Sequence, residues 1–151
     1  MTPVTRAELY IRDAVPMDAA MEQRCLLGRV QALTAAGVID EVTVRTWPPR
    51  VRTDDRWACA RLAPYREFAA WAEDHGAGLV PAFGHRECHN SYTGRDYTVT
   101  VLPMVCLALY ADDELLAVYP HSRSDGIRTV GDGIAELEAQ AGSAQSSPTT
   151  R

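Results

Sequence analysis

Lysine is absent from this sequence of 151 residues: all 15 basic residues are arginine, and 20 carboxylates outnumber them. The formal net charge of −5 argues against a protein built mainly to coat phosphate backbones. The longest uncharged apolar run, residues 99–111, is too short to span a bilayer, and the charged N-terminal segment lacks the apolar block of a signal peptide. We therefore expect a cytoplasmic protein with no membrane partner.

Motifs for redox, nucleotide or covalent chemistry are also missing. The four cysteines, Cys25, Cys59, Cys88 and Cys106, include no C-x-x-C pair, and Cys25 and Cys106 lie in apolar patterns. We interpret these two as reduced core residues. The sequence contains neither a G-x-G-x-x-G run nor a phosphate-binding loop nor a serine nucleophile elbow. These absences favour a protein that is not an enzyme.

Apolar periodicity predicts a single domain over residues 1–141, whereas residues 142–151, rich in Ser, Thr, Gln and Pro, are predicted to form a disordered tail. Leu26, Val30 and Leu33 give the first helix one buried stripe. The last helix is predicted to begin at a capping box formed by Thr129 and Asp132. The expected elements are a strand at 9–11, a helix at 19–36, a strand at 38–47, a loop at 50–61, a helix starting at 64 with Trp71 at its flank, an extended segment at 79–89, a strand region at 97–110, a strand at 114–119 and a helix from 129 onward.

This order predicts an α/β fold in which helices cover a mixed β-sheet. Strands and helices alternate at the start of the chain, which implies a parallel βαβ unit with a right-handed crossover. The later strands are joined by tight turns at Thr93-Gly94 and Asp112-Asp113, so they must pair antiparallel. A ferredoxin-like α+β arrangement is the alternative.

The order βαβ-α-ββ-α resembles the thioredoxin/glutaredoxin fold. The resemblance is carried by Leu102-Pro103 before the apolar segment 104–110, by Asp112-Asp113, and by the strand 115–119. The family's active cysteines lie between the first strand and the first helix, where residues 13–19 contain no cysteine. Thiol–disulfide exchange needs a thiolate at that position, so the resemblance implies the fold without the redox activity.

A second resemblance covers most of the chain. The segments 8–12, 37–44, 68–72 and 92–97, together with Leu102-Pro103, are similar to a group of small haloarchaeal proteins often labelled helix-turn-helix-domain proteins. That label implies DNA binding. A helix-turn-helix needs a second helix a few residues after the first, but here a β-branched strand is expected after Gly37. No helix is expected to carry a compact arginine cluster, so DNA binding is an alternative rather than the main prediction.

The densest group of metal-ligand side chains lies at residues 85–89. In an extended strand, His85, Glu87 and His89 point to one face and Cys88 points to the other. Two imidazoles and a carboxylate can hold zinc or iron. We interpret these residues mainly as the polar face of an exposed hairpin, with no cofactor; a zinc site formed by His85, Glu87 and His89 is the alternative.

Trp57 lies beside Arg56 in an arginine-rich segment, and an exposed tryptophan next to arginine is typical of a protein-binding hot spot. The alternative is a loop that this ring holds against its own domain. The predicted function is a non-enzymatic binding or regulatory module that binds an unidentified protein partner or self-associates. DNA-binding regulation, and metal-dependent chemistry at residues 85–89, are the alternatives.

Overall fold

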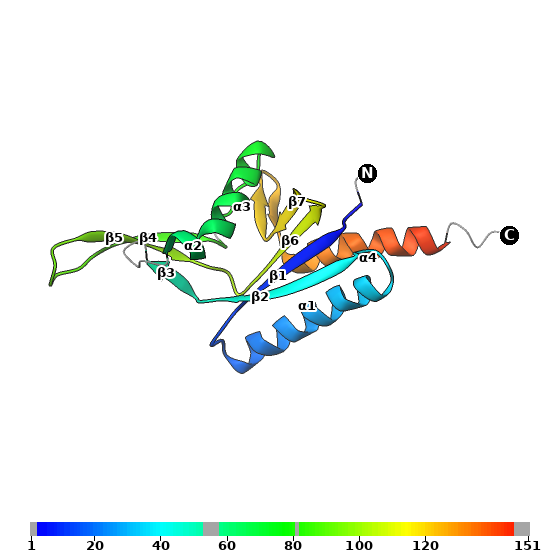
Figure 1. Cartoon of the computed structure of the whole chain (residues 1–151), viewed down its shortest axis with the longest axis horizontal. Helices are drawn as coiled ribbons and strands as arrows, with labels where there is room; N and C mark the ends of the chain where they lie inside the picture. Colours follow the sequence, from blue (N-terminus) through cyan, green and yellow to red (C-terminus); the bar gives the residue numbers. More distant parts are fainter. Residues whose placement is uncertain (1–2, 53–57, 81, 147–151) are drawn as a thin grey trace.

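In the computed structural model, which describes residues 3–52, 58–80 and 82–146, a four-stranded mixed sheet forms the centre of the molecule. Its strand order is β2 (Glu41–Trp47), β1 (Arg6–Arg12), β6 (Val105–Ala111), β7 (Glu114–Tyr119). β1 and β2 run parallel, while β6 runs antiparallel to β1 and β7 antiparallel to β6. The prediction of a mixed sheet in an α/β fold is confirmed (Figure 1).

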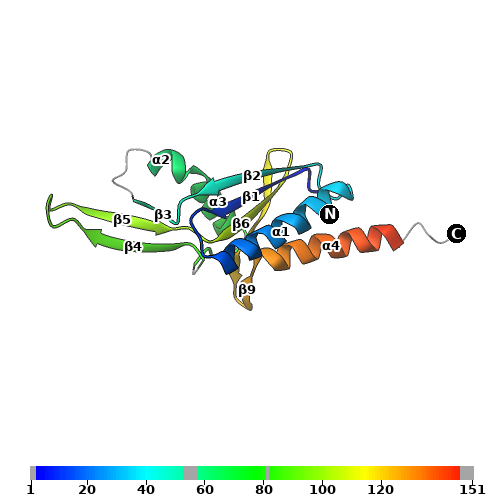
Figure 2. The same ribbon diagram turned by 90° about the horizontal axis from the view of Figure 1, so that it is seen from below.

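Helices cover both faces of this sheet. Helices α1 (Met17–Ala35) and α4 (Val130–Ser146) lie side by side on one face, and α3 (Ala63–Asp74), preceded by the short α2 (Ala58–Arg61), lies on the other (Figures 1 and 2). Among the described residues, no helix combines the length and the apolar character needed to cross a membrane.

Strand β6 is buried on both sides, from Val105 through Tyr110. Cys106, Ala108 and Tyr110 pack toward α3, and the alternate residues pack toward α1 and α4. A strand buried on both faces requires an uninterrupted apolar sequence, which this segment has. The predicted strand region at 97–110 is nevertheless two strands. Residues 102–104 are not part of a strand, and the preceding β5 (Asp96–Val101) belongs to a different sheet.

The predicted stripe of α1 is confirmed, because Leu26, Val30 and Leu33 are all buried against the sheet. Gln23 continues this stripe, and its Nε2 donates hydrogen bonds to the carbonyl oxygens of Arg12 and Met104. Cys25 lies on the exposed side of the helix, so its assignment to the core is wrong. The reason is geometric: position 25 is rotated about 100° from Leu26 around a helix of 3.6 residues per turn.

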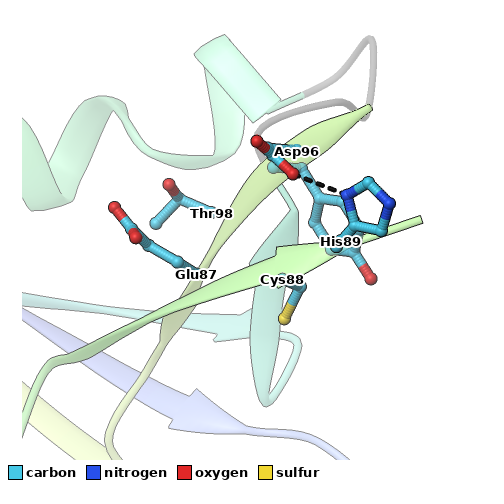
Figure 3. A pocket seen from close by; sticks show the side chains of 6 residues that line it. Glu87, Cys88, His89, Asp96 and Thr98 are labelled. Atoms are coloured by element: carbon cyan, nitrogen blue, oxygen red, sulfur yellow. Dashed lines mark hydrogen bonds and ion pairs between the residues drawn. The ribbon is translucent and has the colours of Figure 1, made fainter. Parts of the chain in front are cut away.

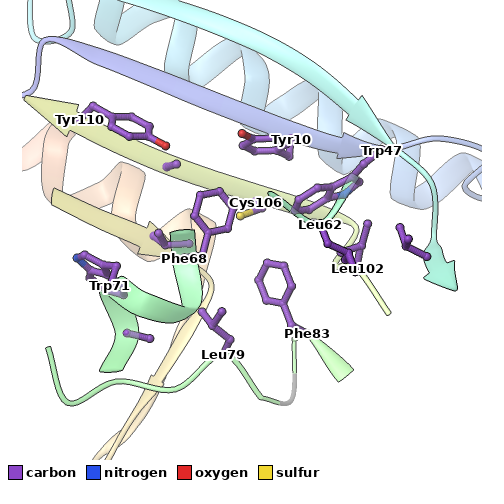
Figure 4. Close-up of a cluster of buried hydrophobic side chains, with 14 residues drawn as sticks. Tyr10, Trp47, Leu62, Phe68, Trp71, Leu79, Phe83, Leu102, Cys106 and Tyr110 are labelled. Carbon is purple, nitrogen blue, oxygen red and sulfur yellow. The ribbon is translucent and has the colours of Figure 1, made fainter. Parts of the chain in front are cut away.

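Aromatic side chains fill the core between α3 and the sheet (Figure 4). The rings of Tyr10 and Trp47 stack with centroids 4.6 Å apart, and Phe68 and Phe83 meet this pair edge-on. Trp71 was expected at the flank of its helix but is buried, and its Nε1 donates a 3.0 Å hydrogen bond to the carbonyl oxygen of Leu116. Each indole in this core thus buries its ring and satisfies its polar atom.

A second, three-stranded sheet is formed by β3 (Arg50–Arg52), β5 and β4 (Gly84–His89), in the order β3-β5-β4. We call it the small sheet. The hairpin of β4 and β5 extends away from the central sheet and turns at residues 90–95, where Gly94 adopts φ +71° (Figure 2). The predicted loop at 50–61 is therefore wrong at both ends, since β3 and α2 occupy them. The predicted extended segment at 79–89 is confined to β4.

The last helix begins as predicted. The backbone N–H of Thr129 donates to the Asp132 carboxylate, and the N–H of Asp132 donates to the Thr129 hydroxyl. The α4 helix then continues through Ser146, five residues into the segment predicted as a tail. A short hairpin of β8 (His121–Arg123) and β9 (Gly126–Arg128), which the sequence analysis missed, joins β7 to this helix.

The first turn of α4 gives a matched pair of glycines for a test of packing. A methyl group at Gly133 would lie 2.6 Å from the buried ring of Tyr119, whereas one at Gly131 would meet nothing closer than 3.6 Å. We expect Gly133→Ala to lower the free energy of unfolding by about 1–3 kcal/mol through overpacking. Gly131→Ala should leave it unchanged or raise it by up to about 1 kcal/mol. Urea denaturation measures both, and equal effects would contradict this packing.

Candidate functional site

In the small sheet, the strand register places the arginine side chains on one face and the carboxylate side chains on the other. Arg52, Val99 and Arg86 are direct cross-strand neighbours, so their side chains share one face of the sheet. Arg50 lies two residues from Arg52 and therefore points to the same face. All three arginines are exposed. We call this surface the arginine face.

Apolar and aromatic groups lie beneath these guanidinium groups. The Arg52 guanidinium carbon lies 4.1 Å from the centroid of the Tyr97 ring, a cation–π distance. Val99 belongs to the same outer face, yet only 7% of its surface is accessible. Long arginine stems cover apolar neighbours in this way while their charged ends stay in water.

The opposite face of the small sheet carries its carboxylates. His85, Glu87 and His89 of β4 lie on this face, opposite Thr100, Thr98 and Asp96 of β5. Near the base of the hairpin it packs on α3, where Tyr65 Oη lies 2.7 Å from His85 Nε2. Among the described residues of the three strands, every arginine is on one face and both carboxylates are on the other. Strand alternation therefore makes the arginine face uniformly positive.

The predicted zinc ligands share a face, as the alternation predicts, and Cys88 points away from Glu87 (Figure 3). Both nitrogens of His85 and the Nδ1 of His89 have other partners. His85 Nδ1 lies 3.3 Å from the hydroxyl of Thr100, and His89 Nδ1 lies 2.7 Å from an oxygen of Asp96. Within the described ranges, no three His, Cys, Asp or Glu side chains form a group that could hold a metal ion. Zinc at His85, Glu87 and His89 stays an alternative interpretation, which these contacts do not test.

Two other expectations concern thiols and the arginine-rich segment. Cys25, Cys88 and Cys106 are free, and burial raises the pKa of the Cys106 thiol well above its usual value. The predicted partner-binding residues Arg56 and Trp57 lie outside the described residues.

The geometry defines the protein as an α/β domain with a projecting small sheet, one side of which is the arginine face. A family model described as a helix-turn-helix domain matches residues 2–142, and the chain belongs to this family. No curated protein matches the chain, and no solved structure matches it.

The arrangement of the helices among the described residues differs from that of the usual helix-turn-helix motif. The motif joins two helices by a turn of 3–4 residues and presents the second to the major groove. Only Leu62 separates α2 from α3, and α3 buries Phe68, Trp71 and Ala72 against the sheet. As predicted, a strand rather than a second helix follows Gly37. The exposed side of α3 is mainly acidic, with Arg66 beside Glu67, Glu73 and Asp74.

The arginine face was missed because residues 50–61 were predicted to be a loop. The alternation of Arg50, Val51 and Arg52 fits a half-buried strand, but three residues are too few to indicate one from the sequence.

Chelation tests the predicted metal site. A metal at His85 would have to displace its hydrogen bonds to Tyr65 and Thr100. We therefore expect the melting temperature of the purified protein to be the same before and after EDTA treatment, with no stoichiometric zinc by elemental analysis. Bound zinc whose removal lowers the melting temperature, and which His89→Ala abolishes, would contradict this expectation and support the site.

Proposed function

We propose that this protein is a cytoplasmic DNA-binding regulator. Its membership of a helix-turn-helix family and the uniformly positive arginine face support this function together. The proposal keeps the expectation of a non-enzymatic binding module and replaces the unidentified protein partner by nucleic acid.

The arginine face is the observation that carries the proposal. Guanidinium groups bind phosphate oxygens through paired N–H donors and also recognise guanine in the major groove. The major groove admits a two-stranded β-ribbon as well as an α-helix, and several DNA-binding proteins read DNA with strands. Arg50 and Arg52 lie on β3 and Arg86 lies on β4, so the arginine face is a charged surface made of strands at the base of the projecting hairpin, which suits this mode of binding.

The exposed sides of the described helices are less suited to DNA. The acidic side of α3 would repel phosphates, and α4 carries Asp132, Glu136 and Glu138 with no basic residue. Helix α1 carries equal numbers of acidic and basic residues. Because the net charge of the protein is −5, a local cluster of positive charge such as the arginine face is needed to attract DNA.

We propose in addition that the chain is related to the haloarchaeal proteins that it resembles and that its fold is thioredoxin-like. The lack of lysine supports the first, and the strand order β2-β1-β6-β7 with helices on both faces supports the second. In a salt-rich cytoplasm, contacts to phosphates are strongly screened. The ring of Tyr92, which is 98% exposed at the turn of the hairpin, would then add van der Waals contact with the DNA, which salt does not screen.

Removal of the three arginines tests the proposal. The variant Arg50→Ala/Arg52→Ala/Arg86→Ala should lose most of its affinity for duplex DNA at low salt, because it removes three phosphate-binding charges from one face. The slope of log K against log salt should become shallower by about 3. Fluorescence anisotropy with a labelled duplex across a KCl series measures both quantities.

The matched control is Arg24→Ala, which removes an exposed arginine from α1. This variant should bind DNA as the unaltered protein does. Absence of DNA binding by the unaltered protein at low salt would overturn the proposed function. Equal losses of affinity in the triple variant and the control would show that the arginine face is not the DNA-binding surface.

A further inference from the structure

Strand β2 is an edge of the central sheet, and within the described residues β1 is the strand that pairs with it. All of its side chains from Glu41 to Thr46 are at least partly accessible. The strand contains no proline, and neither a bulge nor a lysine interrupts it, although proteins commonly use these devices to block edge-to-edge pairing. Among the described residues, no strand therefore covers the outer edge of β2 from Glu41 to Thr46.

Hydrogen bonds at the two ends of β2 fix which backbone groups face outward. The N–H of Glu41 donates to the carbonyl oxygen of Thr5, and the carbonyl oxygen of Trp47 accepts from the N–H of Asp13. In a parallel pair, alternate residues of a strand bond to the same neighbour, so the odd-numbered residues of β2 bond to β1. The N–H and C=O groups of Val42, Val44 and Thr46 therefore point away from the sheet.

The side chains of β2 are complementary to a second, antiparallel copy of the same strand. If Thr43 lies opposite Thr43 of the copy, Val42 lies opposite Val44 and Glu41 lies opposite Arg45. The valine pairs then exchange the outward backbone hydrogen bonds. Glu41 and Arg45 fall in the closer, non-hydrogen-bonded pairs, where their opposite charges attract.

The α1 side of this edge has room for the copy. Val42 and Val44, the latter 44% exposed, line a groove of about 400 Å³ with Gln31, Thr34 and Ala35 of α1. In the register centred on Thr43, Val42 and Val44 of the copy lie next to Val42 and Val44 of the first chain and extend the apolar surface of the groove. On the other side, Arg45 lies 3.8 Å from Glu8 and has a half-exposed side chain, so it can pair with a second carboxylate.

We propose that the occupant of this edge is a second copy of the chain, which forms a two-fold dimer through antiparallel β2–β2 pairing centred on Thr43. The two central sheets become one continuous eight-stranded sheet. A two-fold interface of this kind is self-complementary, so each Glu41–Arg45 contact occurs twice. The edge lies outside the small sheet, and the proposal does not depend on DNA binding.

Charge reversal tests the register. Glu41→Arg alone and Arg45→Glu alone each place two like-charge pairs in the interface, and each should weaken dimerisation about tenfold or more. An equimolar mixture of the two variants should dimerise again, because both contacts then join an arginine to a glutamate. Sedimentation-velocity analysis across a concentration series measures the dimerisation constants of the unaltered protein, of each variant and of the mixture.

Glu22→Arg is the matched control, because it makes the same charge change on exposed α1 and should leave dimerisation unchanged. Circular dichroism checks that each variant is folded, and recovery in the mixture requires folded partners. A monomeric unaltered protein would overturn the proposal. So would a dimer that neither reversal weakens, or a mixture that stays as weak as the separate variants.

Discussion

The burial of β6 on both faces, beside the partly buried β1, is the constraint on which the rest of the structure depends. Two adjacent strands at the centre of the sheet need apolar cover above and below. Helices α1 and α4 supply one layer, and α3 with the aromatic cluster around Phe68 and Phe83 supplies the other. The apolar sides of these helices are therefore occupied inside the domain. Strands carry the surfaces that remain for partners: the hairpin of the small sheet and the outer edge of β2.

Alternate residues of an extended strand point to opposite faces, and this alternation determines which side chains lie together on each of the two surfaces. In the small sheet it places Arg50, Arg52 and Arg86 on one side and Glu87 and Asp96 on the other, so a protein of negative net charge has one uniformly positive face. In β2 the same period separates the row of valines from the charged row. A dimer through β2 would carry two hairpins, and two linked contacts on one duplex bind more tightly than either contact alone.

Local signals in the sequence were sufficient to predict α1, the capping box at Thr129 and the tight turn at Gly94, because residues that are neighbours in the sequence determine these features. The strand character of Arg50–Arg52 depends on pairing with Val99–Val101, about fifty residues away, and three residues alone do not indicate it. The burial of Trp71 depends on β7 in the same way. The shared face of His85, Glu87 and His89 followed from periodicity, whereas their hydrogen-bond partners on α3 and β5 required the tertiary structure.

The central claim is that strands, rather than a helix, contact DNA in this member of a helix-turn-helix family. Amide hydrogen exchange with and without a saturating DNA duplex tests it most directly, because protection maps the contact along the backbone. The account predicts that added protection is concentrated in residues 50–52 and 84–101, with α1, α3 and α4 unchanged. Protection concentrated in one of these helices, with the hairpin unchanged, would contradict it.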